Sequence, residues 1–298
     1  MSTYCLPQFV YGKIIANGND ISGFRVVGNT PALTEEDYHN FVTATFSGQV
    51  FGIKNLLPSY GLTEADSLGR RVLFQIEKSI VPDKRRGPFP IRRGVIVSQE
   101  VFNNFSTLQI VKEINEYKFN REYSSYETLP FLCIKTEKRT LPSNKTSDLN
   151  KYNKMLLYIL DALFSSKSVL VVTKNPDPFF RIALMDIVMS LLPSSLQKQF
   201  SFNTNIYEPL NQVNFKIMFI QSKFVNFSEK VIDIDFFSNF DYKLTSPYTK
   251  YLFSLITQSK ISFKELANYC KKILVDAKFD EHHSVLLYRE LSKIIQNR

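Results

Sequence analysis

The sequence predicts an α/β protein with two domains: an N-terminal domain with a mixed or antiparallel sheet, and a C-terminal α/β domain that ends in helices. Three observations support this prediction. All ten glycines lie between Gly12 and Gly94, so the remainder of the chain makes its turns with other residue types. Ser168–Thr173 is a continuous run rich in β-branched residues, the pattern of a strand covered on both faces. It lies between two apolar helical patterns, as strands of α/β proteins do. From Pro247 onward the pattern is helical.

The N-terminal domain is expected over residues 1–134 and consists mainly of strands and turns. Residues 9–15 and 24–27 flank Asn17-Gly18-Asn19-Asp20, a composition typical of a hairpin turn. Thr34 is followed by three acidic residues, which predicts the start of a helix. The remaining expected elements are strands at 50–53, 71–76 and 94–98, then a helical region from Ser98 to about Tyr117.

Residues 135–151 are almost entirely polar and are predicted to form a linker or a long surface loop. The C-terminal domain follows over residues 152–298. Its expected elements are a helix at 152–165, a strand at 168–173, a helix at 179–192, strands at 200–203, 213–221 and 231–236, and helices at about 248–258, 262–275 and 281–296. Ser262 with Glu265 three residues later predicts a capping box for the second of these last helices.

The glycine distribution argues against several classes of enzyme. A loop that cradles phosphate needs glycine, because only a backbone without Cβ approaches the phosphate oxygens closely. Neither G-x-x-x-x-G-K-[ST] nor G-x-G-x-x-G occurs in the chain. Nucleotide hydrolysis and dinucleotide binding by the usual routes are therefore not expected, and no cofactor is predicted.

Cysteine use and apolar run length suggest a cytoplasmic protein. Cys5, Cys133 and Cys270 are odd in number and widely spaced, which predicts reduced thiols that pack as small hydrophobes. The N-terminus lacks a basic start followed by an apolar run. The longest apolar runs, 155–164 and 182–192, are shorter than the roughly 18–20 residues that span a bilayer.

The densest charge in the sequence runs from Arg70 to Arg93, with eight cations against two anions in a chain of net charge +9. Its centre, Asp83 to Pro88, has the composition of a hairpin loop, so its cations should project into solvent. The predicted contact residues are Arg70, Arg71, Lys84, Arg85, Arg86, Arg92 and Arg93. Arginine forks suit carboxylate or phosphate groups, so the partner could be an acidic protein, nucleic acid or anionic lipid. Without a partner, the same residues would form a solvated loop.

Three further groups of residues are candidates for a catalytic or metal site. His282 and His283 follow two acidic residues, but adjacent residues on a helix point about 100° apart and do not face one metal. His39 lies in the first expected helix, and Asp233 and Asp235 alternate along an expected strand. An enzyme site remains an alternative only if these distant residues converge in a pocket. No metal site is predicted.

The chain resembles the bacterial GTPase-associated protein 1 family over roughly residues 9–240. The similar segments in the second half are Ser168–Thr173, Arg181-Ile182-Ala183-Leu184, Leu191-Leu192-Pro193 and Phe200-Ser201-Phe202-Asn203-Thr204. Those in the first half are Tyr11-Gly12, Gly23-Phe24 and Arg85-Arg86-Gly87-Pro88-Phe89. The resemblance implies a longin-like N-terminal domain and a middle part similar in outline to DENN-type modules. Many relatives have a histidine after the Arg/Gly turn, and none follows Gly87 here, so no ligand site at that turn is carried over.

These observations predict a non-enzymatic adaptor or regulatory protein that binds a protein partner. The resemblance implies that the partner is a small GTPase or another component of a bacterial defence system. The acidic residues Glu77 and Asp83 within the basic segment favour a protein surface over a uniform polyanion. The alternative is a nucleic-acid or anionic-membrane binding module that uses the same segment.

Overall fold

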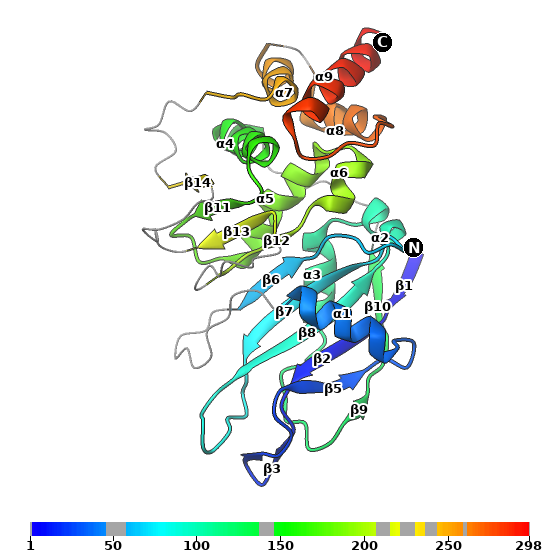
Figure 1. Ribbon diagram of the computed structural model, residues 1–298, viewed down its shortest axis with the longest axis vertical. Helices are drawn as coiled ribbons and strands as arrows, with labels where there is room; N and C mark the ends of the chain where they lie inside the picture. Colours follow the sequence, from blue (N-terminus) through cyan, green and yellow to red (C-terminus); the bar gives the residue numbers. More distant parts are fainter. Residues whose placement is uncertain are drawn as a thin grey trace. The chain divides into compact units, whose positions relative to one another are not determined.

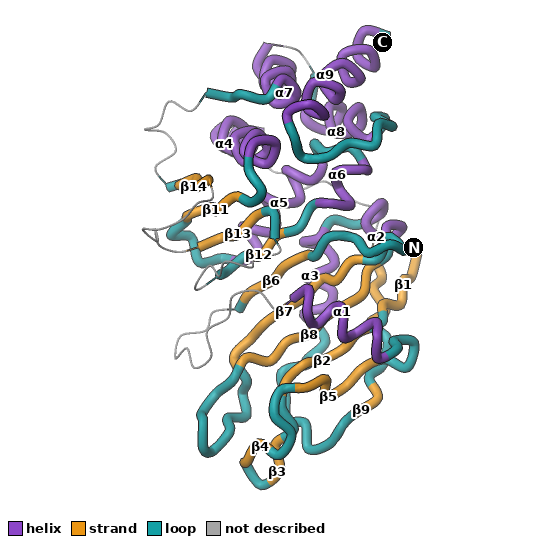
Figure 2. Tube along the Cα trace, in the orientation of Figure 1, coloured by secondary structure: helices purple, strands orange, loops and turns teal. Residues whose placement is uncertain are grey.

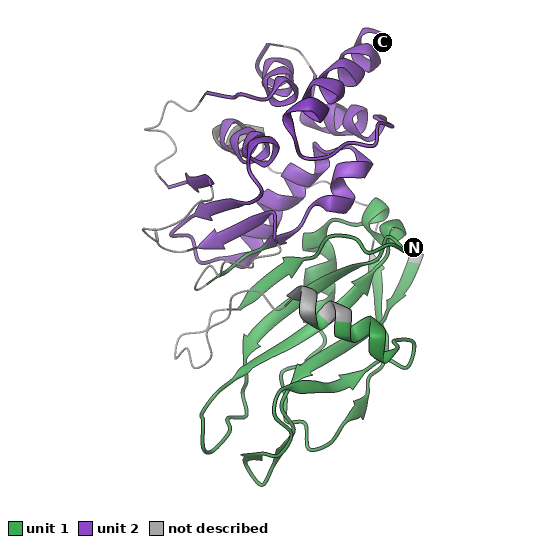
Figure 3. Ribbon diagram, viewed as in Figure 1, with its two compact units in different colours: residues 1–140, 203–214 green, residues 141–202, 215–298 purple. Residues whose placement is uncertain are grey.

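The computed structural model describes residues 2–45, 58–136, 146–206, 215–220, 230–235, 243–258 and 261–297. The chain has the α/β fold class, with a large mixed sheet and smaller sheets. It divides into two compact units, one of residues 1–140 and 203–214 and the other of residues 141–202 and 215–298 (Figure 3). The first boundary falls within the expected linker, whereas the return of residues 203–214 to the first unit was not expected.

The sheet of the first unit is mixed, and neighbouring strands lie in the order β6-β7-β8-β2-β5-β9 (Figures 1 and 2). In that order the strands are Ser59–Leu62, Arg71–Lys78, Pro90–Val97, Gln8–Gly12, Arg25–Asn29 and Glu127–Thr128. All of these pairs are antiparallel except β5 with β9. β7 and β8 are the longest strands and are almost entirely buried, so both faces of the sheet centre are covered.

The expected hairpin turn is present between β3 (Ile15–Ala16) and β4 (Asn19–Asp20), which pair antiparallel. Asn17 and Gly18 adopt φ values of 52° and 78°, the left-handed region that such a turn requires. The hairpin is inserted between β2 and β5, which pair with each other as the two flanking segments were expected to do.

The helices of the first unit are α1 (Glu35–Thr45), α2 (Gln99–Asn104) and α3 (Thr107–Asn115). The Thr34 hydroxyl accepts the amide proton of Asp37 at 3.2 Å, which confirms the expected start of α1. Two helices replace the single helical region expected after Ser98, because Phe105 is extended and Ser106 starts α3 with its own capping box. The strand expected at 50–53 lies outside the described residues.

The second unit contains a parallel arrangement of strands in the order β14-β11-β13. These strands are Lys230–Asp233, Val169–Val172 and Ile217–Ile220, and β12 (Phe202–Asn203) lies where the chain passes back to the first unit. β11 has a parallel neighbour on each side and is completely buried, which explains its unbroken apolar sequence. α4 (Thr146–Ser165) precedes β11, and α5 (Pro178–Ser190) and α6 (Ser194–Gln199) lie between β11 and β12 in the chain.

The three C-terminal helices are α7 (Pro247–Gln258), α8 (Phe263–Lys271) and α9 (Glu281–Gln296), close to their expected bounds. The predicted capping box is confirmed, since Ser262 and Glu265 each accept the other's backbone amide proton through a side-chain oxygen. Buried Asp161 of α4 accepts the amide protons of Thr245 and Ser246 just before α7 begins. α4 is thereby tied to the N-terminus of α7.

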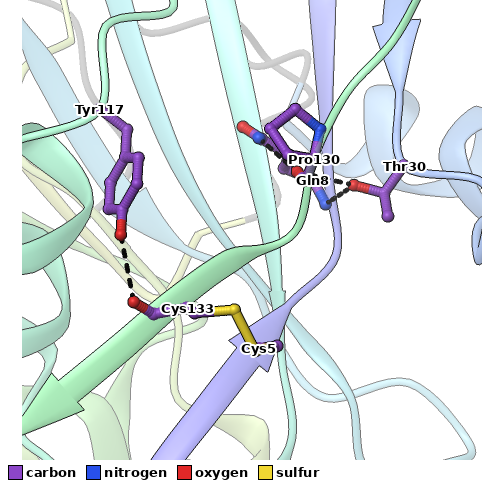
Figure 4. The surroundings of a disulfide bond; sticks show 6 residues. All are labelled: Cys5, Gln8, Thr30, Tyr117, Pro130 and Cys133. Atoms are coloured by element: carbon purple, nitrogen blue, oxygen red, sulfur yellow. Dashed lines mark hydrogen bonds between the residues drawn. A yellow bond between two sulfur atoms is a disulfide. The ribbon is translucent and has the colours of Figure 1, made fainter.

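The cysteines differ from the prediction. Cys5 and Cys133 form a disulfide between β1 (Ser2–Leu6) and β10 (Leu132–Thr136), which pair antiparallel (Figure 4). The expectation of reduced thiols is therefore wrong for these two residues, because strands 128 residues apart in sequence bring them directly opposite one another. Cys270 is a buried free thiol, as expected.

Among the helices of the described residues, none is both long and apolar enough to cross a bilayer.

Candidate functional site: a basic tip fixed by a buried lysine

The seven predicted contact residues do not form one exposed surface. Lys84, Arg85 and Arg86 are exposed, as expected for the loop. Arg70 is partly buried and pairs with Asp37 at 2.9 Å and Asp66 at 2.8 Å. The other three, Arg71, Arg92 and Arg93, are buried. The segment from Arg70 to Arg93 is therefore not one surface, because Arg71, Arg92 and Arg93 lie in the central strands β7 and β8, where both faces of the sheet are covered.

The buried arginines have structural partners. The Arg71 Nε donates to the Thr63 carbonyl at 2.8 Å, and its guanidinium lies 5.2 Å from the centre of the Phe102 ring. Arg92 lies over the Tyr11 ring. Burial lowers the pKa of Arg71 to about 9 and the pKa of Arg92 to about 10, so both side chains remain charged at neutral pH. These residues stabilise the sheet and are not available to a partner.

The exposed cations lie on the closed loop between β7 and β8. Asp83 and Gly87 exchange two backbone hydrogen bonds, of 3.1 and 2.7 Å, and Gly87 has a φ of 75°. The Asp83 carboxylate also accepts the amide proton of Arg85 at 2.9 Å. Lys84, Arg85 and Arg86 therefore occupy a defined turn at one end of the sheet.

This loop is joined to the β3–β4 hairpin, which lies at the same end of the sheet (Figure 1). The Lys84 amide donates to the Gly18 carbonyl at 2.8 Å, and the Lys84 Nζ donates to the Asn17 carbonyl at 2.8 Å. A Cβ added to Gly18 would lie 2.3 Å from Cε of Lys84. The lysine stem thus lies directly on the glycine, and we refer to residues 17–21 with residues 79–88 as the tip.

Lys13 is the residue that fixes the tip from beneath. Its side chain is only 3% exposed, and its Nζ lies 2.9 Å from a carboxylate oxygen of Asp20 and 3.5 Å from one of Asp83. The rings of Phe24 and Phe89 lie over the ammonium group, with centroids at 4.9 and 5.4 Å. One buried cation therefore links the hairpin to the basic loop.

Sequence reasoning did not identify Lys13 as part of the site. The available signal was a single lysine at the end of an apolar strand pattern, directly before a hairpin turn that carries Asp20. An isolated cation at such a position requires a buried partner, because burial of an unpaired charge is strongly unfavourable. The second partner, Asp83, is far away in sequence and could not be inferred.

Exposed apolar side chains accompany the cations of the tip. Ile21 directly follows Asp20 and is 64% exposed, and Ile80 in the basic loop is 67% exposed. Ile14, the residue after Lys13, belongs to a buried apolar cluster with Val10, Val27, Ile91, Phe119, Tyr123 and Leu129. The tip thus presents arginine and isoleucine side chains on a fixed backbone.

The charges of Asp20 and Asp83 determine how the tip responds to acid. Burial alone raises the pKa of Asp20, but hydrogen bonds from Lys13, Ser22 and Gly23 outweigh this effect and bring its pKa below the usual value. The pKa of Asp83 is lowered by the hydrogen bond from the Arg85 amide and by the charge of Lys13. Because both pKa values are lowered in the folded protein, the two charged carboxylates stabilise the tip fully above about pH 4. This stabilisation is lost as pH falls through the lowered pKa values of Asp20 and Asp83.

We expect Lys13→Met to make the tip more open than the wild type near pH 6 and to remove its opening in acid. The variant leaves Asp20 and Asp83 without their cation, so their pKa values rise, and protonation then relieves their repulsion, whereas in the wild type it breaks the ion pairs with Lys13. Hydrogen exchange of residues 17–23 and 79–89 between pH 3 and 6 measures the opening. Lys112→Met, at an exposed position of α3, is the matched control and should behave as the wild type. Identical profiles for the two variants would contradict the linking role of Lys13.

The histidines and paired aspartates weighed as catalytic or metal residues have other surroundings. His39 is exposed on α1 in the first unit. In the second unit, His283 hydrogen-bonds with Asp280, the N-cap of α9, and the His282 ring meets the His283 ring edge-on. The described residues contain no group of three or more His, Cys, Asp or Glu side chains arranged to hold a metal.

Asp233 and Asp235 close the end of β14. The Asp235 carboxylate accepts protons from the Thr173 hydroxyl and the Lys174 amide, and the Asp233 carboxylate accepts the amide proton of Asp235. These hydrogen bonds fasten the end of β14 to the residues that follow β11, which is a structural role.

No protein-family model matches the chain, and a search of curated proteins finds no match. The resemblance to the GTPase-associated protein 1 family therefore stays a prediction, based on the segments quoted above.

Proposed function

We propose that this protein is a non-enzymatic adaptor or regulatory protein that binds an acidic surface of a protein partner through the tip of its first unit. The observation that supports the proposal is the basic loop with Lys84, Arg85 and Arg86, fixed on the hairpin by buried Lys13 and flanked by exposed Ile21 and Ile80. By the resemblance, the partner would be a small GTPase or another component of a bacterial defence system in the cytoplasm.

Two physical arguments favour a protein partner. A fixed loop loses less conformational entropy on binding than a mobile one, so more of its contact energy appears as affinity. Arginine and exposed apolar side chains together match the composition of protein interfaces, in which arginine anchors are enriched. Nucleic-acid binding would use the same cations but would have no need of exposed isoleucines.

Reversal of the charges on the loop tests the proposal. We expect Lys84→Glu, Arg85→Glu and Arg86→Glu together to weaken binding to the partner by about 100-fold or more. The reversed charges would repel the acidic surface that the wild-type cations attract. Affinity capture from the native host, followed by titration of the captured protein, provides the measurement. The matched control reverses three exposed lysines of the second unit, Lys250, Lys264 and Lys278, with the same change in net charge. Equal capture by both triple variants and the wild type would contradict the proposal.

The same wild-type protein and triple variants also test the nucleic-acid and membrane alternatives. Retention of single-stranded RNA, duplex DNA and phosphatidylserine vesicles is measured for the wild type and both triple variants. Phosphate binding would weaken with salt, with a log–log slope of about −0.7 to −0.9 per contact. Retention that requires the loop cations, in the absence of any captured protein, would favour these alternatives over the adaptor.

A further inference from the structure

We propose that the Cys5–Cys133 disulfide is a reversible redox latch that holds the N-terminal strand β1 on β10. This inference goes beyond the proposed function and does not depend on it. The chain has few, widely spaced cysteines, which favours a reducing compartment, yet two of these cysteines are bonded in the structure.

The latch joins two strands at directly opposite positions. Cys5 pairs with Cys133 in the antiparallel register (Figure 4). The neighbouring pair, Leu6 and Leu132, is buried. The Tyr117 hydroxyl donates to the carbonyl oxygen of Cys133 at 3.2 Å. The two cysteines are 128 residues apart, so the bond closes a loop that includes most of the first unit.

The sulfur atoms are in a position to react. Cys5 is exposed and Cys133 is half-buried, so a reductant can approach the bond from the Cys5 side. Cys270 offers the opposite environment, because it is completely buried and burial raises its pKa to about 12. The chain therefore has one reachable disulfide and one thiol that stays protonated and inert.

The proposed reaction is thiol–disulfide exchange with a dithiol reductant. A thiolate of the reductant attacks Sγ of Cys5, the Sγ–Sγ bond breaks, and Cys133 leaves as a thiolate that takes up a proton. The second thiol of the reductant then attacks the mixed disulfide and releases the Cys5 thiol. The protein disulfide gains two electrons and the dithiol becomes a disulfide, and a small-molecule disulfide reverses the sequence.

Reduction would release β1 without disturbing β2. The backbone carbonyl of Pro7, the single residue between the two strands, accepts a hydrogen bond from the Ile96 amide at 2.9 Å. Beyond this point β1 is held by its pairing with β10 and by side-chain contacts of Tyr4 such as the hydrogen bond from Asn104 at 3.1 Å. Opening would therefore hinge near Pro7 and expose the edge of β10.

Alkylation and hydrogen exchange test this proposal on the intact chain. The native protein is incubated with dithiothreitol, then with a maleimide, and the adducts are mapped by mass spectrometry. We expect two adducts, at Cys5 and Cys133, and none at Cys270. Hydrogen exchange in residues 2–6 and 132–136 should accelerate by about tenfold or more on reduction, because the covalent restraint on local opening is removed. Oxidised glutathione should restore protection.

Two variants control the experiment. Cys5→Ser with Cys133→Ser should exchange like the reduced wild type whether or not reductant is present, and Cys270→Ser should retain the full response. The wild-type reductant titration alone decides the question if the double variant does not fold. Three results would overturn the proposal: thiols that stay free under glutathione disulfide, a bond that dithiothreitol opens only after denaturation, or identical exchange in both redox states.

Discussion

Asp161→Ala is expected to lower the free energy of unfolding of the second unit by about 3–5 kcal/mol. Asp161 lies on α4 and is completely buried. Its carboxylate accepts the amide protons of Thr245 and Ser246 and the hydroxyl protons of Thr245 and Thr249, at distances from 2.5 to 3.1 Å. Alanine would leave buried donors without acceptors and would remove a negative charge from the N-terminus of α7.

Urea unfolding monitored by hydrogen exchange in residues 245–258 measures this effect. Asp276→Ala replaces an exposed aspartate of the same unit and should change stability by less than about 0.5 kcal/mol. A destabilisation by Asp161→Ala no larger than that of the control would contradict the role assigned to this carboxylate.

Arg93→Met is the second substitution for which we expect a large effect, a loss of about 3–5 kcal/mol from the first unit. The Arg93 guanidinium donates to the carbonyl oxygens of Ile114 and Tyr117 at the end of α3, and to the Gln75 side chain on the neighbouring strand. It also lies 4.6 Å from the centre of the Phe119 ring. A cation at a helix C-terminus satisfies carbonyl groups that lack partners within the helix.

Burial lowers the pKa of Arg93 to about 10, so the side chain is still charged near neutral pH. Methionine preserves much of the side-chain length but leaves three acceptors without their donor. Arg86→Met is the matched control at an exposed position of the tip, and it should leave the thermal midpoint nearly unchanged. If both substitutions shift the midpoint equally, Arg93 does not anchor α3.

The sequence predicts most elements of the fold because local patterns determine them. Ser262 and Glu265 form the expected capping box, Asn17 and Gly18 form the expected turn, and β11 forms from a continuous apolar run rich in valine. Each of these depends on residues a few positions apart. The expected linker at 135–151 was too long, because α4 begins at Thr146.

The features that escaped prediction depend on contacts between distant segments. The sequence predicts one contact surface from Arg70 to Arg93, because charge alone does not show that the end of α3 covers Arg93. The pairing of Cys5 with Cys133 requires β1 and β10 to be neighbours, and neither strand was expected. The link through Lys13 needs the hairpin and the basic loop at one end of the sheet, which only the tertiary structure establishes.

The most direct test of the binding proposal places a photo-reactive amino acid at Arg85 on the tip and, in a second variant, at Lys112 on α3, where the side chain is also exposed. Irradiation in the native host is followed by mass spectrometry of the covalent products. The proposal predicts a protein adduct from position 85 that is absent from position 112. Adducts from position 85 to nucleic acid or lipid alone, or the same protein adduct from both positions, would contradict it.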